Sequence, residues 1–271
     1  MFYNKKELQL QYEGFIKTPF LWHGIGLFDL VQFEHNNQAA ISYQDNIPEK
    51  LRLGKQVERF VSFELQHTEH IKLLAENIQI QQEKMTLGEL DCLLLENNIP
   101  VHLEIIYKFY LYDPSITTSE INKWIGPNRR DSLTQKLTKL TEKQLPLLYS
   151  NECKIYLETI GFSSETMVQK VYFKAQLFVP LHSIQKEYPY LNNQCILGYY
   201  CTKNELSQFS NAKFYIPSKH NWLVLPHAHV SWLNYTSFLE KVSCYLQEEN
   251  APLCWVKKPN GEFLKLFVVW W

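Results

Sequence analysis

The stretch LGELDCLLLENNIPVHLEIIYKFYL, residues 87–111, decides the fold. Two apolar runs, residues 87–95 and 101–111, flank the short polar sequence ENNIP, which is typical of a turn between two strands. Both runs are apolar on either face, and this favours strands in the middle of a covered sheet. Asp91 and Glu104 nevertheless stand in these runs, and a buried carboxylate is costly unless a partner stabilises its charge.

Side-chain alternation along the two strands predicts that the acids meet. Glu89 and Asp91 share one face of the first strand, and Glu104 shares a face of the second with His102 and Lys108. In a hairpin, one register of pairing sets Asp91 beside Glu104. Two facing carboxylates resist ionisation, and a divalent cation with oxygen ligands relieves their repulsion. The spacing therefore predicts a Mg²⁺ or Mn²⁺ site at Asp91 and Glu104, suited to phosphodiester hydrolysis.

The flanking sequence predicts further elements around this pair. Apolar residues recur at helical spacing before it, and polar and apolar residues alternate in a strand just ahead of it. The expected elements are a helix over residues 51–66 that carries Glu58, a strand over residues 73–81, a helix that starts near Asn128 with Asp131 and ends near Pro146, and a strand over residues 168–181. The predicted order is helix, three strands, helix, strand.

This pattern resembles known proteins. Glu58, the GELD of residues 88–91 and the glutamate of the next strand resemble the PD-(D/E)XK nuclease superfamily. The longer pattern GELD, HLE…KFYL, WIGPN, D…KL and QLPLL resembles more closely an uncharacterised bacterial family, domain of unknown function 1853, over residues 50–150. The resemblance implies an α/β protein with a restriction-endonuclease-like αβββαβ core, in which Asp91 and Glu104 are metal ligands and Glu58 is an auxiliary acid. We expect this core, with an N-terminal helical lead-in, over residues 1–180, and an α+β extension over residues 181–271.

The chain departs from the superfamily pattern at its lysine. That pattern places a lysine two residues after the glutamate, where this chain has Ile106. Lys108 stands four residues after Glu104 on the same face, and a bulge in the strand would bring it closer. Lys108 is the candidate to position the nucleophile, although it can equally close the exposed end of its strand; Lys136 or Gln144 are alternative donors.

Basic residues gather after the predicted strands. Residues 123–143 hold six basic and two acidic residues, a net charge of 6 − 2 = +4. Arg129, Lys136 and Lys143 recur every seven residues, so we expect them to line one flank of the predicted helix. Together with Arg130 they are the candidates for binding a nucleic-acid backbone. A solvated helix face is the alternative explanation.

Composition limits the classes of function. The net charge is -1, and we find neither an apolar run of about 20 residues that would span a membrane nor a secretory signal. The six cysteines form no CxxC pair, so we expect reduced thiols, no disulfides and a cytoplasmic protein. His227 and His229 share one face of a predicted strand, without an acid or cysteine nearby to complete a metal site. Glycine-rich phosphate loops and serine elbows are absent from the sequence.

The sequence therefore predicts a metal-dependent phosphodiesterase, a nuclease-like hydrolase that acts on DNA or RNA. A catalytically inactive protein of the same fold that binds nucleic acid or a protein partner is the alternative, which the displaced lysine supports. A sugar- or nucleotide-processing enzyme that uses the same carboxylates is a third hypothesis. Glu58 can also be a surface residue of its helix, paired with Lys55 or Arg59.

Overall fold

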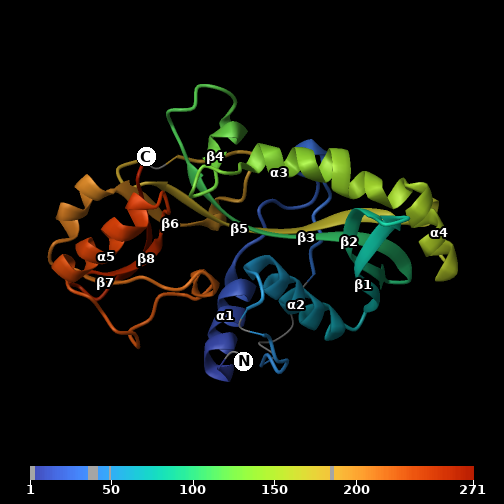
Figure 1. The fold of residues 1–271 in the computed structure, drawn as a ribbon, viewed down its shortest axis with the longest axis horizontal. Coiled ribbons are helices and arrows are strands. Elements are labelled where there is room, and N and C mark those ends of the chain that lie inside the picture. The colour runs from blue at the N-terminus through green and yellow to red at the C-terminus, as the bar shows by residue number, and fades with distance from the viewer. Residues whose placement is uncertain (1–3, 36–41, 49, 184–185) are drawn as a thin grey trace. The chain divides into compact units, whose positions relative to one another are not determined.

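The protein is a mixed α/β chain built on a large sheet with helices packed on it (Figure 1). The structure, a computed structural model, describes residues 4–35, 42–48, 50–183 and 186–271. It divides into a first unit of Met1–Lys5, Phe20–Tyr107 and Gln135–Lys174, and a second unit of Lys6–Pro19, Lys108–Thr134 and Ala175–Trp271. Strands β3 (Ile99–Tyr112) and β5 (Val168–Pro180) contribute residues to both units. The boundary after residue 180 that we expected remains a prediction.

Four strands form the sheet of the first unit in the order β1-β2-β3-β5. Strand β1 (Ile71–Gln82) pairs antiparallel with β2 (Met85–Glu96), and β2 pairs antiparallel with β3. The β2–β3 turn has Asn97 and Asn98 at φ values of 50° and 66°. A two-residue hairpin turn of type I′ needs positive φ at both central positions, and asparagine tolerates this conformation better than most residues. The polar ENNIP sequence is therefore a hairpin turn, as predicted.

Two helical segments cover this sheet. Helix α2 (Leu53–Gln66) buries its apolar stripe. Figure 1 shows this helix on one face of the sheet and the segment that runs to α4 on the opposite face. That second segment consists of α3 (Leu133–Lys139), the π-helix η3 (Leu140–Gln144), the 3₁₀-helix η4 (Leu145–Tyr149) and α4 (Asn151–Thr159). Leu148, Cys153 and Leu157 pack in one core with the apolar side chains of β1 and β2. The predicted order of helix, three strands, helix and strand is confirmed, with the two-residue β4 (Trp124–Ile125) and α4 added.

The helix after the strands begins later than expected. Helix α3 starts at Leu133, and Asn128 caps no helix. Its side chain instead accepts a hydrogen bond from the backbone N–H of Ala251 at 2.9 Å and donates to Asn250 Oδ1 at 3.3 Å. The predicted helix start at Asn128 and Asp131 is therefore wrong, because a tertiary contact takes the side chain that would have capped the helix. Pro146 does not end the helical segment either, since it stands near the start of η4, where its missing N–H costs no hydrogen bond.

The second unit is also built from helices and strands. Its strands follow the order β5-β6-β9-β8-β7, in which β5, β6 and β9 are parallel and the rest antiparallel, while β4 pairs with the end of β3. Helix α5 packs on this sheet, where Phe214 and Phe238 stack with ring centroids 4.0 Å apart. The remaining elements of this unit are α1 (Lys5–Lys17), β6 (Ile196–Thr202), β7 (Lys213–Tyr215), α5 (Tyr235–Gln247), β8 (Leu253–Lys257) and β9 (Phe263–Val269), with short 3₁₀-helices at Glu120–Lys123, Asn193–Cys195, Lys203–Phe209 and His220–Trp222. The first unit has two further 3₁₀-helices, at Leu27–Asp29 and Ser164–Thr166.

His227 and His229 lie outside any strand. They belong to an irregular segment between His220–Trp222 and α5, with ring centroids 6.2 Å apart and the His229 backbone N–H donating to His227 Nδ1. The prediction that a strand presents both rings on one face is therefore wrong. The apolar residues around the two histidines suggested a strand, but the backbone there is irregular, and this backbone sets the positions of the two rings.

The cysteines are all thiols in this structure. Five of the six are buried, and Cys244 is exposed. Within the described ranges, no helix combines the length and the apolar character that crossing a bilayer requires.

Candidate functional site

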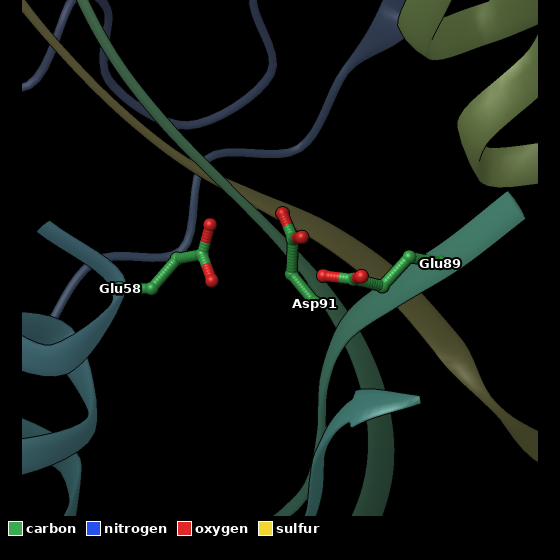
Figure 2. Close-up of side chains that lie close together, drawn as sticks. All are labelled: Glu58, Glu89 and Asp91. Carbon is green, nitrogen blue, oxygen red and sulfur yellow. The ribbon is translucent and has the colours of Figure 1, made fainter. Parts of the chain in front are cut away.

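Three carboxylates converge in the first unit from helix α2 and strand β2. Glu58, Glu89 and Asp91 each offer an oxygen within 4.8 Å of the other two. Figure 2 shows the Asp91 carboxylate between those of Glu58 and Glu89. Helix α2 presents Glu58 because its apolar stripe faces the core and leaves this residue at the edge of the stripe. Glu89 and Asp91 are two positions apart on one strand, so their side chains leave it on the same face.

Glu104 is a fourth carboxylate, buried on β3 with 0% exposure. The backbone ladder between β2 and β3 ends at the pair Cys92↔Leu103, and the next position of this register holds Asp91 and Glu104. There, Asp91 Oδ2 accepts a hydrogen bond from the backbone N–H of Ile105 at 2.9 Å. The Asp91 side chain thus takes over a backbone donor of β3 at the end of the ladder, which fixes its carboxylate beside that strand.

Burial and the charges of neighbouring acids oppose the ionisation of Asp91 and Glu58. Burial is the main cause that raises the pKa of Asp91 to about 8, and the nearby charge of Glu104 adds to it, while the Ile105 hydrogen bond acts against it. Burial also raises the pKa of Glu58, although its hydrogen bond with Lys55 works in the opposite direction. A nearby cation would favour the ionised form of both acids.

Lys55 is a cation that contacts this group of acids directly. Its Nζ donates to Glu58 Oε2 at 2.8 Å, to Asn77 Oδ1 at 2.8 Å and, in a very close contact, to Glu89 Oε1. Lys55 and Glu58 are three residues apart on α2, and such residues are neighbours on a helix surface. One alternative for Glu58, pairing with Lys55, is therefore observed, and the same carboxylate also belongs to the group with Glu89 and Asp91.

Two side chains hold Glu104 as a hydrogen-bond acceptor. Gln144 Nε2 donates to Glu104 Oε2 at 2.5 Å, and His102 Nε2 lies 3.2 Å from Glu104 Oε1. Gln144 stands at the end of the π-helix η3, a wider turn that occurs often at functional sites. Lys136 Nζ donates to Gln144 Oε1 at 2.7 Å. The Gln144 amide therefore links the Lys136 ammonium group to the Glu104 carboxyl group.

Gln169 sets the tautomer of His102. Its Nε2 donates to the Leu145 carbonyl oxygen at 2.7 Å and lies 3.0 Å from His102 Nδ1. Because the same amide nitrogen faces both groups, Nδ1 must be an acceptor, and the proton of a neutral ring then sits on Nε2. His102 therefore donates its Nε2–H to Glu104. Such outer hydrogen bonds orient a carboxylate that binds metal.

Lys108 lies on β3 and is paired within the second unit. Its Nζ donates to Asp131 Oδ2 at 2.6 Å. Ile106, which occupies the position of the superfamily lysine, is only 3% exposed. A role for Lys108 in positioning the nucleophile stays a prediction, whereas the ammonium group that contacts the acids comes from Lys55.

Arg129 contacts its own unit through both its charge and its guanidinium face. Its Nη2 lies 2.8 Å from Asp113 Oδ2, and its guanidinium carbon lies 4.5 Å from the centre of the Trp271 ring. Because α3 starts at Leu133, Arg129 precedes the helix, so the expected helical row of basic residues every seven positions is wrong.

The other predicted phosphate-binding residues differ in their surroundings. Lys136 is half-buried and bonded to the Gln144 side chain, while Arg130 and Lys143 are exposed. Arg130 belongs to the second unit and Lys143 to the first. Binding of nucleic acid by these residues stays a prediction.

The donor set of the carboxylate group fits a hard divalent cation. Mg²⁺ and similar ions prefer carboxylate oxygens, and ligands about 2.1 Å from an ion stand about 4.2 Å apart on its opposite sides. The oxygens of Glu58, Glu89 and Asp91 all lie within 4.8 Å of one another, a limit close to this span. We predicted Asp91 and Glu104 as the ligands; the geometry groups Asp91 with Glu58 and Glu89, and Glu104 adjoins them as a buried neighbour.

Sequence reasoning missed three residues of this site. Glu89 was recognised only as sharing a face with Asp91, and that alternation was the available signal. Lys55 was considered only as a surface partner of Glu58. Gln169 gave no signal, because a glutamine at the start of a strand is common and its partners lie far away in the sequence.

Comparison with known proteins gives one match. The family described as Domain of unknown function (DUF1853) matches residues 26–269, which include every residue of the site. No curated protein and no solved structure matches the chain. The match spans most of the 271 residues, and the chain belongs to the DUF1853 family.

Proposed function

We propose that this protein is a metal-dependent phosphodiesterase that acts on nucleic acid in the cytoplasm, with a restriction-endonuclease-like core. The observation that carries the proposal is the convergence of Glu58, Glu89 and Asp91, with Glu104 beside them, at the end of the β2–β3 ladder. So many acids at one partly buried place are costly without a cation. The order α2, β1, β2, β3, the helical segment to α4, and β5 supports the core assignment.

The residues of the site divide the work of such a reaction. A bound Mg²⁺ or Mn²⁺ would neutralise charge on the phosphodiester and make a coordinated water more acidic. Glu58, Glu89 and Asp91 would hold the ion, and Asp91 is additionally oriented by the Ile105 N–H. Glu104, held by His102 and Gln144, would complete the ligand set or orient water. Lys108 could position the nucleophile only if its ion pair with Asp131 opens.

Exposed basic side chains would hold the polymer. In the first unit, Lys143 is exposed and would contact phosphates, which position a nucleic acid without reading its bases. Arg130 is exposed in the second unit and would offer the same kind of contact there. Because Arg129 and Lys136 already contact other side chains of the protein, we expect them to contribute less to affinity than the sequence suggested.

A cleavage assay tests this proposal. Purified wild type, incubated with labelled single- and double-stranded DNA and RNA, should cleave at least one of them with Mn²⁺ or Mg²⁺ and none with EDTA. Asp91→Asn should lose this activity, and Glu142→Gln, a similar loss of one carboxylate at an exposed position of η3, should keep it. Equal cleavage by wild type and Asp91→Asn would show that the activity comes from elsewhere.

A catalytically inactive binding protein of the same fold is the second candidate. The pairing of Lys108 with Asp131 and the burial of Ile106 favour it, because they leave the usual lysine position without an ammonium group. On this alternative, the wild type binds nucleic acid in a mobility-shift assay but cleaves none of the substrates with either metal ion.

A further inference from the structure

Lys55 occupies the position of a counter-ion in the carboxylate group. Its ammonium group contacts Glu58 and Glu89, and a third hydrogen bond to Asn77 completes the donor capacity of Nζ. Glu58 and Glu89 are also two of the three residues whose oxygens lie within 4.8 Å of one another. The ammonium group and a divalent cation would therefore use the same carboxylates.

The side chain of Lys55 is able to leave this position. It is 39% exposed, whereas those of Glu58 and Glu89 are 16% and 29% exposed. Lysine carries its charge on a flexible four-carbon stem, and an exposed ammonium group regains water when it moves outward. The carboxylates, in contrast, are held by the packing of α2 and by the β2 strand.

We propose that Lys55 is an internal counter-cation that a divalent metal ion must displace, so that this lysine sets the metal concentration at which the site is filled. The inference rests on the proposed metal site and adds its regulation. Without metal, the ammonium group neutralises part of the charge of Glu58 and Glu89 and keeps the acids together. When metal enters, the ammonium group loses these two partners and turns toward solvent.

Removal of the competitor should tighten metal binding. Lys55→Met keeps the length of the apolar stem but removes the charge, and we expect it to bind Mn²⁺ about tenfold more tightly than wild type in isothermal titration calorimetry. The control is Arg59→Met, which removes one positive charge from an exposed position of the same helix and should change the dissociation constant by less than about twofold.

Thermal melting gives a second readout that does not depend on activity. In EDTA, Lys55→Met should melt below wild type, because Glu58 and Glu89 then lack their cation; at saturating Mn²⁺ the two melting temperatures should converge. If Lys55→Met folds poorly, Lys55→Gln provides the same loss of charge with a polar end that can still bond to Asn77.

The outcomes separate this inference from the proposed function. Tighter binding by the lysine variants supports the displacement. If the lysine variants bind Mn²⁺ no more tightly than the wild type, while Asp91→Asn does not bind it, the role of Lys55 is overturned and the metal site stands. If neither wild type nor the lysine variants take up Mn²⁺, the metal site itself is overturned, and the role of Lys55 falls with it.

Discussion

Replacement of Asp91 by asparagine is expected to stabilise the metal-free protein while it abolishes the response to metal. Asparagine has nearly the same shape, and its Oδ1 can accept the Ile105 N–H that Asp91 Oδ2 accepts at 2.9 Å. The substitution therefore removes little besides an acid whose ionisation burial and the neighbouring Glu104 make unfavourable. It also removes the middle carboxylate of the group shown in Figure 2, which we propose as a metal ligand.

The size of this effect follows from the pKa of Asp91, which rises from 3.8 to about 8 in the folded protein. At about 1.4 kcal/mol per pH unit, this difference sets a ceiling of about 4 kcal/mol at neutral pH. Partial solvent exposure of the site and the charge of Lys55 reduce the effect, so we expect a gain of about 1–3 kcal/mol in the free energy of unfolding. In a chain of this size, that gain corresponds to a rise in melting temperature of about 2–8 °C.

The pH dependence of this gain has a definite sign. Between pH 3.8 and about 8, folded Asp91 keeps a proton that the unfolded chain releases. The folded state then binds more protons, so the stability of the wild type falls as pH rises through this range. The advantage of Asp91→Asn should therefore grow from about pH 5 to about pH 8.

Differential scanning fluorimetry in EDTA and in Mn²⁺ measures both effects. Wild type should gain stability from Mn²⁺ and Asp91→Asn should not, while Glu142→Gln should match wild type in both buffers because Glu142 is exposed. A melting temperature of Asp91→Asn in EDTA that is unchanged or lower would refute the reasoning about its buried charge. A retained stabilisation by Mn²⁺ would show that Asp91 is not a ligand.

Three further substitutions test other parts of the structure. Gln169→Leu should weaken Mn²⁺ binding measured by calorimetry and lower stability by about 1–3 kcal/mol, because the buried Nδ1 of His102 loses its donor; unchanged affinity would show that the orientation of the ring is unimportant. Arg129→Ala should lower the free energy of unfolding, measured by urea titration, by about 2–4 kcal/mol, because Asp113, only 3% exposed, loses its cation. A loss of nucleic-acid affinity without a loss of stability would contradict this structural role of Arg129. Burial lowers the pKa of Lys265 to about 7, so above that pH the unfolded chain binds more protons than the folded protein. The stability of the wild type relative to Lys265→Met should therefore rise from about pH 7 to about pH 10. Parallel curves of stability against pH for the two proteins would contradict this effect of burial.

Hydrophobic pattern was sufficient for the central elements. The runs around Asp91 and Glu104 are apolar on both faces and are joined by a turn with two asparagines, and both features act locally on the backbone. The pairing Cys92↔Leu103 gives the register that the interval between the two acids suggests. Helix α2 was visible for the same reason, because its buried stripe recurs at helical spacing.

Features that depend on distant partners were not visible. Asn128 looks like a helix cap in the sequence, but Asn250 and Ala251, more than a hundred residues later, take its side chain. The π-helix that brings Gln144 to Glu104 has no recognisable sequence pattern, since one altered turn depends on the packing around it. The helical row of basic residues failed because it assumed a helix from Asn128 onward.

The burial of β3 explains why the ammonium group at Glu58 and Glu89 comes from Lys55 of α2 and not from that strand. Ile106, two residues after Glu104, is only 3% exposed, and a lysine buried there would pay a large desolvation cost unless it was fully paired. Helix α2 offers a better origin, because the stem of Lys55 starts at a half-exposed position and its ammonium group still reaches Glu58 and Glu89. A cation supplied from a helix surface can leave for solvent, whereas one supplied from the middle of a covered strand cannot. This difference in mobility allows Lys55 and a metal ion to compete for the same carboxylates, and a double variant tests it. If Lys55 acts partly through Glu89, Lys55→Met should tighten Mn²⁺ binding less in a Glu89→Gln background than it does in the wild type.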